Sequence, residues 1–183
     1  MVKLIATLGT SPGGVFETYT NLINGNYESD NPSKVEIDTI YLIRTLDKDV
    51  EFAFKLVKAL FICQKIPSEV VEIKINISDI TNKQEYEQFK SQIFQKIGKG
   101  DFVDFTGGRK AMSVAAAIQA LKRDAYLVTT IIPQSEYNRI QNKLKELKNK
   151  ENEINDILAN KNLSLCPELN ELIVHGARTI LLS

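Results

Sequence analysis

Two short turns carry the residues of this chain that could do chemistry. Each turn follows a short apolar stretch, at residues 4–8 and 101–105. The first turn is Gly9-Thr10-Ser11-Pro12-Gly13-Gly14, and the second is Thr106-Gly107-Gly108-Arg109-Lys110. Glycines let a ligand approach the backbone closely, hydroxyl groups donate and accept hydrogen bonds, and the two cations attract anions. The combination favours a site for phosphate groups.

The segments around these turns have the pattern of a strand before the turn and a helix after it. Residues 15–23 follow the first turn with helical spacing, and residues 109–121 follow the second with an alanine-rich, period-3.6 spacing. In an open parallel sheet the carboxyl ends of the strands share one edge, so both turns open on the same side. If the first and fourth strands are neighbours, the turns face each other where ligands usually bind. The free N–H groups of a first helical turn add attraction for anions there.

The same strand and helix alternation continues along the chain. Strand patterns occupy residues 35–43, 70–75 and 125–132, and helix patterns occupy 47–64 and 84–97, with Asp47 as a cap. Such a series predicts an α/β fold, a Rossmann-like doubly wound sheet that is mainly parallel.

The segment after residue 133 differs from the rest. Residues 137–160 are rich in lysine and glutamate and predict a surface helix that is interrupted near Lys150. Residues 172–174 and 179–182 flank a turn and predict a terminal β-hairpin. We therefore expect a Rossmann-like ligand-binding domain at 1–133 and, at 134–183, an appendage of a helix and a hairpin that serves in dimerisation or as a lid.

Composition excludes several classes of protein. The 183 residues include 23 basic and 23 acidic side chains, and a net charge of zero argues against non-specific binding to DNA. No apolar run reaches the length of a membrane span, and the chain begins directly with a strand pattern, so we expect a cytoplasmic protein without membrane contact. Cys63 and Cys166 lie far apart without metal-ligand spacing, which predicts two reduced thiols.

Other chemistries have weaker support. Glu72-Ile73-Lys74 resembles the end of a metal-dependent nuclease signature, but the alternation also suits a half-exposed strand, and no acidic partner precedes it convincingly. His175 is the only histidine, and in a hairpin turn it would ordinarily be solvated. The sequence has no zinc-type His/Cys cluster, no Walker loop and no full Gly-x-Gly-x-x-Gly, so we predict no metal and no cofactor.

Taken together, the two turns carry a resemblance to a known family. Residues 8–12 (LGTSP) and 104–113 (DFTGGRKAMS) resemble the two signature turns of CRISPR-associated Rossmann-fold (CARF) domains, and the resemblance covers Met1 to Pro133. It implies binding of a cyclic oligoadenylate, usually cyclic tetra-adenylate, in the crevice of a homodimer. Most members carry an effector behind this domain, but residues 134–183 offer neither the Arg-His motif of a ribonuclease effector nor a basic DNA-recognition helix.

The chain therefore is most similar to stand-alone ring nucleases, which cut the cyclic messenger and switch off type III CRISPR signalling. The resemblance implies that Ser11 and Lys110 are catalytic, with Arg109 as a second cation. It implies a metal-independent cut by the ribose 2′-hydroxyl, giving linear di-adenylate with a 2′,3′-cyclic phosphate. The residues expected to bind the ligand are Gly9, Thr10, Pro12, Gly13, Gly14, Arg44, Thr106, Gly107, Gly108 and Met112, with Gln134, Tyr137 and Arg139 as further candidates for the adenine pockets.

Three alternatives stay open at this stage. Ser11 could act as the N-cap of the first helix, alone or in addition to a role in binding. The pocket could hold the messenger without cutting it, as a receptor or a sensor subunit. An unrelated enzyme could also use such a crevice for a mononucleotide or a sugar phosphate.

Overall fold

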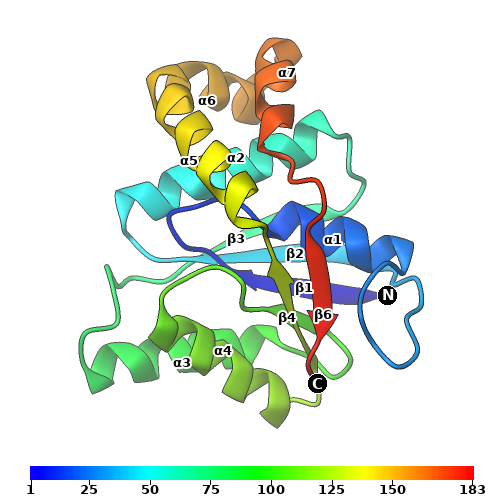
Figure 1. Ribbon diagram of the computed structural model, residues 1–183. Coiled ribbons are helices and arrows are strands. Elements are labelled where there is room, and N and C mark those ends of the chain that lie inside the picture. The colour runs from blue at the N-terminus through cyan, green and yellow to red at the C-terminus, as the bar shows by residue number, and fades with distance from the viewer.

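A six-stranded sheet forms the centre of the computed structural model, which describes residues 1–183 (Figure 1). The strands are β1 (Val2–Thr7), β2 (Ile37–Arg44), β3 (Glu69–Lys74), β4 (Phe102–Asp104), β5 (Tyr126–Ile131) and β6 (Arg178–Leu181). Their order in the sheet is β3-β2-β1-β4-β5-β6, and only β6 runs antiparallel to its neighbour. The Rossmann-like doubly wound fold is confirmed. β1 and β4 are neighbours, as the placement of the two turns requires.

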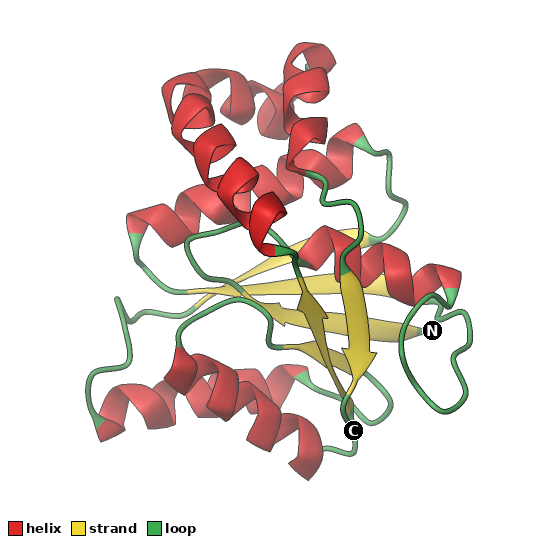
Figure 2. Cartoon of the chain, in the orientation of Figure 1, coloured by secondary structure: helices red, strands yellow, loops and turns green.

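Helices cover both faces of this sheet (Figure 2). α1 (Val15–Asn24) and α2 (Lys48–Cys63) lie on one face, and α3 (Lys83–Lys96) and α4 (Lys110–Lys122) lie on the other (Figure 1). β1 shows why: Leu4 and Ala6 belong to the core beneath α1 and α2, whereas Ile5 belongs to the core beneath α3 and α4. A strand buried on both faces has a continuous apolar run, and this is why residues 4–6 of β1 show no polar alternation. No helix has the length and apolar character needed to cross a membrane.

The helices after β5 pack on α2. α5 (Gln134–Leu147) and α6 (Glu151–Asn160) are separated by a 3-10 turn at 148–150, so the predicted interruption near Lys150 is confirmed. A short helix, α7 (Cys166–Leu169), follows between two further 3-10 turns. Apolar side chains of α5 and α6 join the same core as α1 and α2, among them Ile140, Leu144, Ile154 and Ile157. The division at residue 133 stays a prediction, and side chains from both sides of it share one core.

The predicted terminal hairpin is wrong. Leu172 ends a 3-10 turn, and no strand precedes the glycine turn at Gly176. The carbonyl groups of Glu171 and Ile173 accept hydrogen bonds from the Arg139 guanidinium, so this segment is bound to α5 instead of to β6. β6 pairs with β5 and extends the main sheet.

The prediction of two reduced cysteines is also wrong. Cys63, the last residue of α2, forms a disulfide with Cys166, the first residue of α7, with the two Cα atoms 5.5 Å apart. Distance along the sequence gave no hint of this proximity, which arises because the helices after β5 fold back onto α2. Intracellular proteins usually keep their cysteines reduced, although those of hyperthermophiles are an exception.

Removing the disulfide should destabilise the chain. It joins residues 103 apart, and closing a loop of that length destabilises the unfolded state by about 5 kcal/mol in the chain-entropy account. We expect a Cys63→Ser, Cys166→Ser double variant to lose about that much free energy of unfolding in urea titrations. Reductant should destabilise the wild type to a similar extent and leave the double variant unchanged. Equal stability of the wild type and the double variant under oxidising conditions would contradict the presence of the disulfide.

Candidate functional site

The turns after β1 and β4 touch each other backbone to backbone. The Thr7 hydroxyl donates a hydrogen bond to the Gly107 carbonyl at 2.6 Å. A Cβ atom on Gly107 would lie 2.6 Å from the Thr7 carbonyl oxygen, and one on Gly9 would lie 2.9 Å from the Gly108 nitrogen. Backbone atoms cannot yield to such contacts, so both positions require glycine. The glycines predicted to serve a ligand also allow the two turns to pack together.

Thr106 ties the second turn to the strands β4 and β5. Its backbone N–H and its hydroxyl both donate to one oxygen of the buried Asp104 carboxylate, at 2.9 and 2.5 Å. The Thr106 hydroxyl oxygen in turn accepts the N–H of Thr130 in β5 at 2.7 Å. The second oxygen of Asp104 is buried without a hydrogen-bond partner, and burial raises the pKa of this carboxyl group. These bonds hold the turn in one conformation.

The two turns line a pocket of about 350 Å³, which we call the Ser11 pocket. Seven of the predicted binding or catalytic residues are found here, together with three from β5 and the segment after it. The lining residues are Gly9, Thr10, Ser11, Gly13, Thr106, Gly107, Gly108, Thr130, Ile132 and Tyr137. The pocket therefore offers hydroxyl groups and backbone N–H groups beside one aromatic ring.

Ser11 does not cap the first helix. α1 begins after Gly14, whose φ of 107° is a conformation that glycine adopts readily. The Ser11 Oγ accepts a long hydrogen bond of 3.4 Å from the Gly13 N–H and faces the pocket. The capping alternative is wrong, and the hydroxyl remains able to bind a ligand. Pro12 and Gly14 are buried and do not line the pocket.

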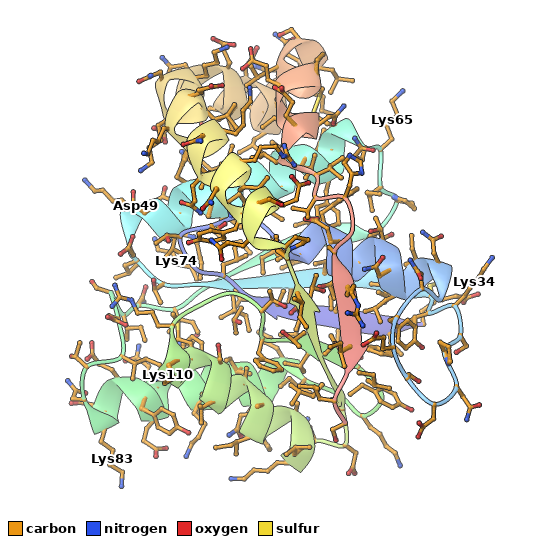
Figure 3. All side chains as sticks on the ribbon, viewed as in Figure 1. Lys34, Asp49, Lys65, Lys74, Lys83 and Lys110 are labelled. Carbon is orange, nitrogen blue, oxygen red and sulfur yellow. A yellow bond between two sulfur atoms is a disulfide. The ribbon has the colours of Figure 1, made fainter.

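The two predicted cations lie at the start of α4 and differ in their surroundings. Lys110 is the exposed first residue of α4, and no ion pair holds it. In Figure 3, Lys110 and Lys74, the last residue of β3, lie towards the left of the view, and Lys34 lies towards the right. Arg109 is 69% exposed and forms a 3.0 Å ion pair with Asp79, in the loop after β3. Neither cation lines the Ser11 pocket.

Arg109 instead lines a second, smaller pocket of about 170 Å³, which we call the Asp79 pocket. It shares the residues Gly9, Thr10 and Gly108 with the Ser11 pocket, so the two pockets are neighbours across the first turn. Its other lining residues are Thr45, Asp47, Val50, Ser78, Asp79, Arg109 and Met112. Met112, a predicted binding residue, is therefore placed at this second pocket.

Arg44 does not lie where the prediction needs it. Its side chain is buried, its Nε is 2.7 Å from the Glu72 carboxylate, and it donates a second hydrogen bond to the Thr45 carbonyl. It lines neither pocket, because its cation is used to hold β2 and β3 together. The same ion pair occupies Glu72, the acid of the nuclease-like motif. No group of three or more His, Cys, Asp or Glu side chains is arranged to hold a metal ion.

Of the further candidates after β5, only Tyr137 lines the Ser11 pocket. Arg139 pairs with Glu136 in the first turn of α5, at 2.7 Å, and binds the carbonyl groups described above. Gln134 hydrogen-bonds Asn138 within α5. His175 is exposed, and its backbone N–H donates to Glu136. Glu136 and Arg139 thus bind the segment before β6 to the helix turn that carries Tyr137.

A buried acid lies behind the first turn. The Glu17 carboxylate accepts the Gly14 N–H at 3.4 Å inside the first turn of α1. Burial raises the pKa of Glu17 to about 7, and the N–H groups of Gly14 and Val174 only partly oppose this shift. The nearby charge of Asp104 raises it further. The protein therefore places a group that titrates near neutral pH beneath the site.

Sequence reasoning missed part of the site. Thr45, Ser78 and Asp79 follow β2 and β3, and Thr130 and Ile132 lie at the end of β5. All of these lie at the carboxyl edge of the sheet, so the rule that found the two turns could have drawn attention to them. Nothing in their residue types distinguished them from ordinary loop and strand residues.

Sequence comparison bears on the identity of the chain. It is similar to the CRISPR system ring nuclease SSO2081 of Saccharolobus solfataricus, with 39% identity over 189 residues that cover 98% of each chain. This chain belongs to the CRISPR ring nuclease family. The ring nuclease resemblance is therefore confirmed, and the similarity extends past the predicted limit at Pro133 to 98% of the chain.

Part of this chain is also similar to a solved structure. The solved structure of Can2 from Sulfobacillus thermosulfidooxidans in complex with cyclic tetra-adenylate matches 70% of this chain, with a TM-score of 0.47 and 12% identity. The match covers 32% of the Can2 chain, so the ring nuclease spans about a third of that structure. No protein-family model matches the sequence.

The raised pKa of Glu17 should make the stability of the ring nuclease depend on pH. The folded protein keeps a proton that the unfolded chain releases between about pH 4.5 and 7, so the free energy of unfolding falls as pH rises through this window. The full effect is about 3 kcal/mol. Urea titrations at pH 5 and pH 8 should show this loss in the wild type and a smaller one in Glu17→Gln. An equal loss in both proteins would exclude Glu17 as its source.

Proposed function

We propose that this ring nuclease binds cyclic tetra-adenylate and cleaves it without a metal ion, giving linear di-adenylate with 2′,3′-cyclic phosphate ends. The observation that carries the proposal is the pairing of the two turns. A serine hydroxyl and glycine residues line a pocket of about 350 Å³ at one edge of the sheet, and an unpaired lysine, Lys110, begins α4 two residues after Gly108 in that lining. These are groups that bind and polarise a phosphodiester.

The substrate itself supplies the nucleophile in this reaction. The ribose 2′-oxygen forms a bond to the adjacent phosphorus and loses its proton, while the bond from phosphorus to the 5′-oxygen breaks and that oxygen gains a proton. The products carry a 2′,3′-cyclic phosphate and a 5′-hydroxyl, and no water is consumed. The protein must align the attacking and leaving oxygens and stabilise the extra charge on the phosphoryl oxygens.

The residues at the site suit these two tasks. Ser11, with its hydroxyl facing the pocket, would orient the 2′-hydroxyl or bind a phosphoryl oxygen. The N–H groups near Gly107 and Gly108 would hold the phosphate, because α4 begins there without a side-chain cap. Lys110 would supply the charge that stabilises the transition state. Its side chain is exposed and unpaired, so it can reach over the rim without breaking an existing ion pair.

One protomer does not enclose the proposed ligand. A ring of four nucleotides is much larger than a 350 Å³ pocket, so we propose that a homodimer surrounds it. α4 offers an apolar face for this dimer. Val114, Ile118 and Leu121 are 49, 37 and 55% exposed. They follow Lys110 at spacings of three and four residues, so all four side chains lie on one face of the helix. A two-fold axis along this face would bring both copies of Lys110 to one ligand.

Cleavage of cyclic tetra-adenylate in EDTA, followed by chromatography and mass, tests the activity. We expect linear di-adenylate with a cyclic phosphate, a single-turnover rate lowered on the order of 100-fold in Lys110→Ala, and at least about tenfold in Ser11→Ala. Lys83→Ala, at the exposed first residue of α3 and outside the proposed dimer face, is the matched control and should cleave like the wild type.

The other possible results of the cleavage assay lead to different conclusions. An intact ring that co-elutes with the protein would indicate a receptor that does not cleave its ligand. Absence of binding would indicate that the pocket holds a different phosphorylated ligand. Unchanged rates in Lys110→Ala would remove that lysine from the mechanism.

Oligomeric state tests the α4 face. Ile118→Glu should convert a dimer into a monomer in light scattering and reduce cleavage with it, because a charge cannot be buried against an apolar partner surface. Leu163→Glu is the control, since Leu163 is a similarly exposed leucine outside α4. A wild-type monomer that still cleaves the ring would contradict the dimer, and a dimer in both variants would place the interface elsewhere.

A further inference from the structure

The Asp79 pocket has no role in the chemistry above, and its position makes it accessible to the same ligand. It adjoins the Ser11 pocket at Gly9, Thr10 and Gly108, which line both pockets. A nucleotide whose phosphate lies on these turns can therefore extend its base into the Asp79 pocket. Its volume of 170 Å³ equals that of about six molecules of liquid water, which is room for one heterocyclic base but not for a second nucleotide.

The inner surface of this pocket suits the face of a flat ring. Val50 and Met112 are both buried side chains, and they supply its apolar lining. A methionine side chain adapts to the shape of its neighbours, and its sulfur makes favourable contacts with aromatic rings. A base inserted here would contact these two apolar side chains, and the Thr45 and Ser78 hydroxyl groups and the Asp47 carboxylate, which also line the pocket, can hydrogen-bond its edge.

The rim carries a specific pair of hydrogen-bonding groups. One Asp79 oxygen accepts the Ile80 N–H at 2.7 Å, which fixes the carboxylate, and the other lies 3.0 Å from Arg109 NH1. A carboxylate oxygen with free lone pairs therefore lies directly beside a guanidinium that has further N–H groups to donate. The pair presents an acceptor next to a donor. The charge of Asp79 also keeps Arg109 over this pocket instead of over the Ser11 pocket.

We infer that Asp79 and Arg109 read the base of the ligand and select a purine that carries a 6-amino group. The 6-amino group of adenine donates a hydrogen bond, and the ring nitrogen beside it accepts one, which complements the pair. A 6-oxo purine would place a carbonyl oxygen against the Asp79 carboxylate, where neither atom can donate. The inference rests on the proposed function and adds to it a basis for choosing adenine over guanine or hypoxanthine.

Binding of two rings that differ only at position 6 of the bases tests this inference. Affinities for cyclic tetra-adenylate and cyclic tetra-inosinate are measured by calorimetry in the Ser11→Ala background, which limits cleavage. We expect tetra-adenylate to bind at least about tenfold more tightly, as one mismatched pair of this type allows. In Asp79→Asn the amide can donate to a 6-oxo group, so this ratio should fall towards one.

The control and the other outcomes separate the possible causes. Asp38→Asn makes the same chemical change at an exposed position on β2 and should leave the ratio unchanged. If Asp79→Asn leaves this affinity ratio unchanged, even where both rings bind more weakly by the same factor, then Asp79 has a purely structural role and the inference is overturned. Equal binding of both rings by the parent protein would also overturn it and leave the proposed function standing. Failure of both rings to bind would overturn the proposed function and this inference with it.

Discussion

The site depends on the close approach of two backbones. The turns after β1 and β4 can lie against each other only because Gly9 and Gly107 have no side chains, and the bond from the Thr7 hydroxyl to the Gly107 carbonyl fixes their distance. This approach in turn requires β1 and β4 to be neighbours, and that is the point where the strand order of the sheet reverses. The contact between the two turns thus requires both the strand order and the glycines, and the two pockets depend on that contact.

A layer of polar side chains supports this contact from inside the protein. Asp104 and Thr106 bind the second turn to β5, while Thr18 in α1 hydrogen-bonds the hydroxyl of Thr130 at 2.5 Å. Glu17 lies in the same region, so two buried acids lie behind a surface that offers N–H groups and cations to a ligand. Buried polar networks of this kind fix geometry well because each broken bond leaves an unpaired group. The stability of this layer and the shape of the site are therefore connected.

The sequence was most informative where a pattern follows directly from geometry. Alternating strands and helices predicted the sheet, and two glycine-rich turns predicted where its ligand edge lies; Asp47 was found as the cap of α2 because its carboxylate can accept free N–H groups. Errors occurred where contacts depend on the fold as a whole. Nothing local to Arg44 shows that Glu72 will neutralise it, and nothing local to Cys63 shows that Cys166 will reach it. The Asp79 pocket was missed for the same reason, since it forms only where the segments after four strands, β1 to β4, meet.

The covalent bond between α2 and α7 also changes what a break in the chain would do. Everything from β3 to α6 lies within the loop that Cys63 and Cys166 close, including the turn with Gly107 and Gly108 and the start of α5 with Tyr137. A protease that cut the backbone once anywhere in that loop would leave two fragments still joined through sulfur. Under oxidising conditions a nicked chain would therefore keep both glycine turns in one molecule, and only reduction would let the fragments separate.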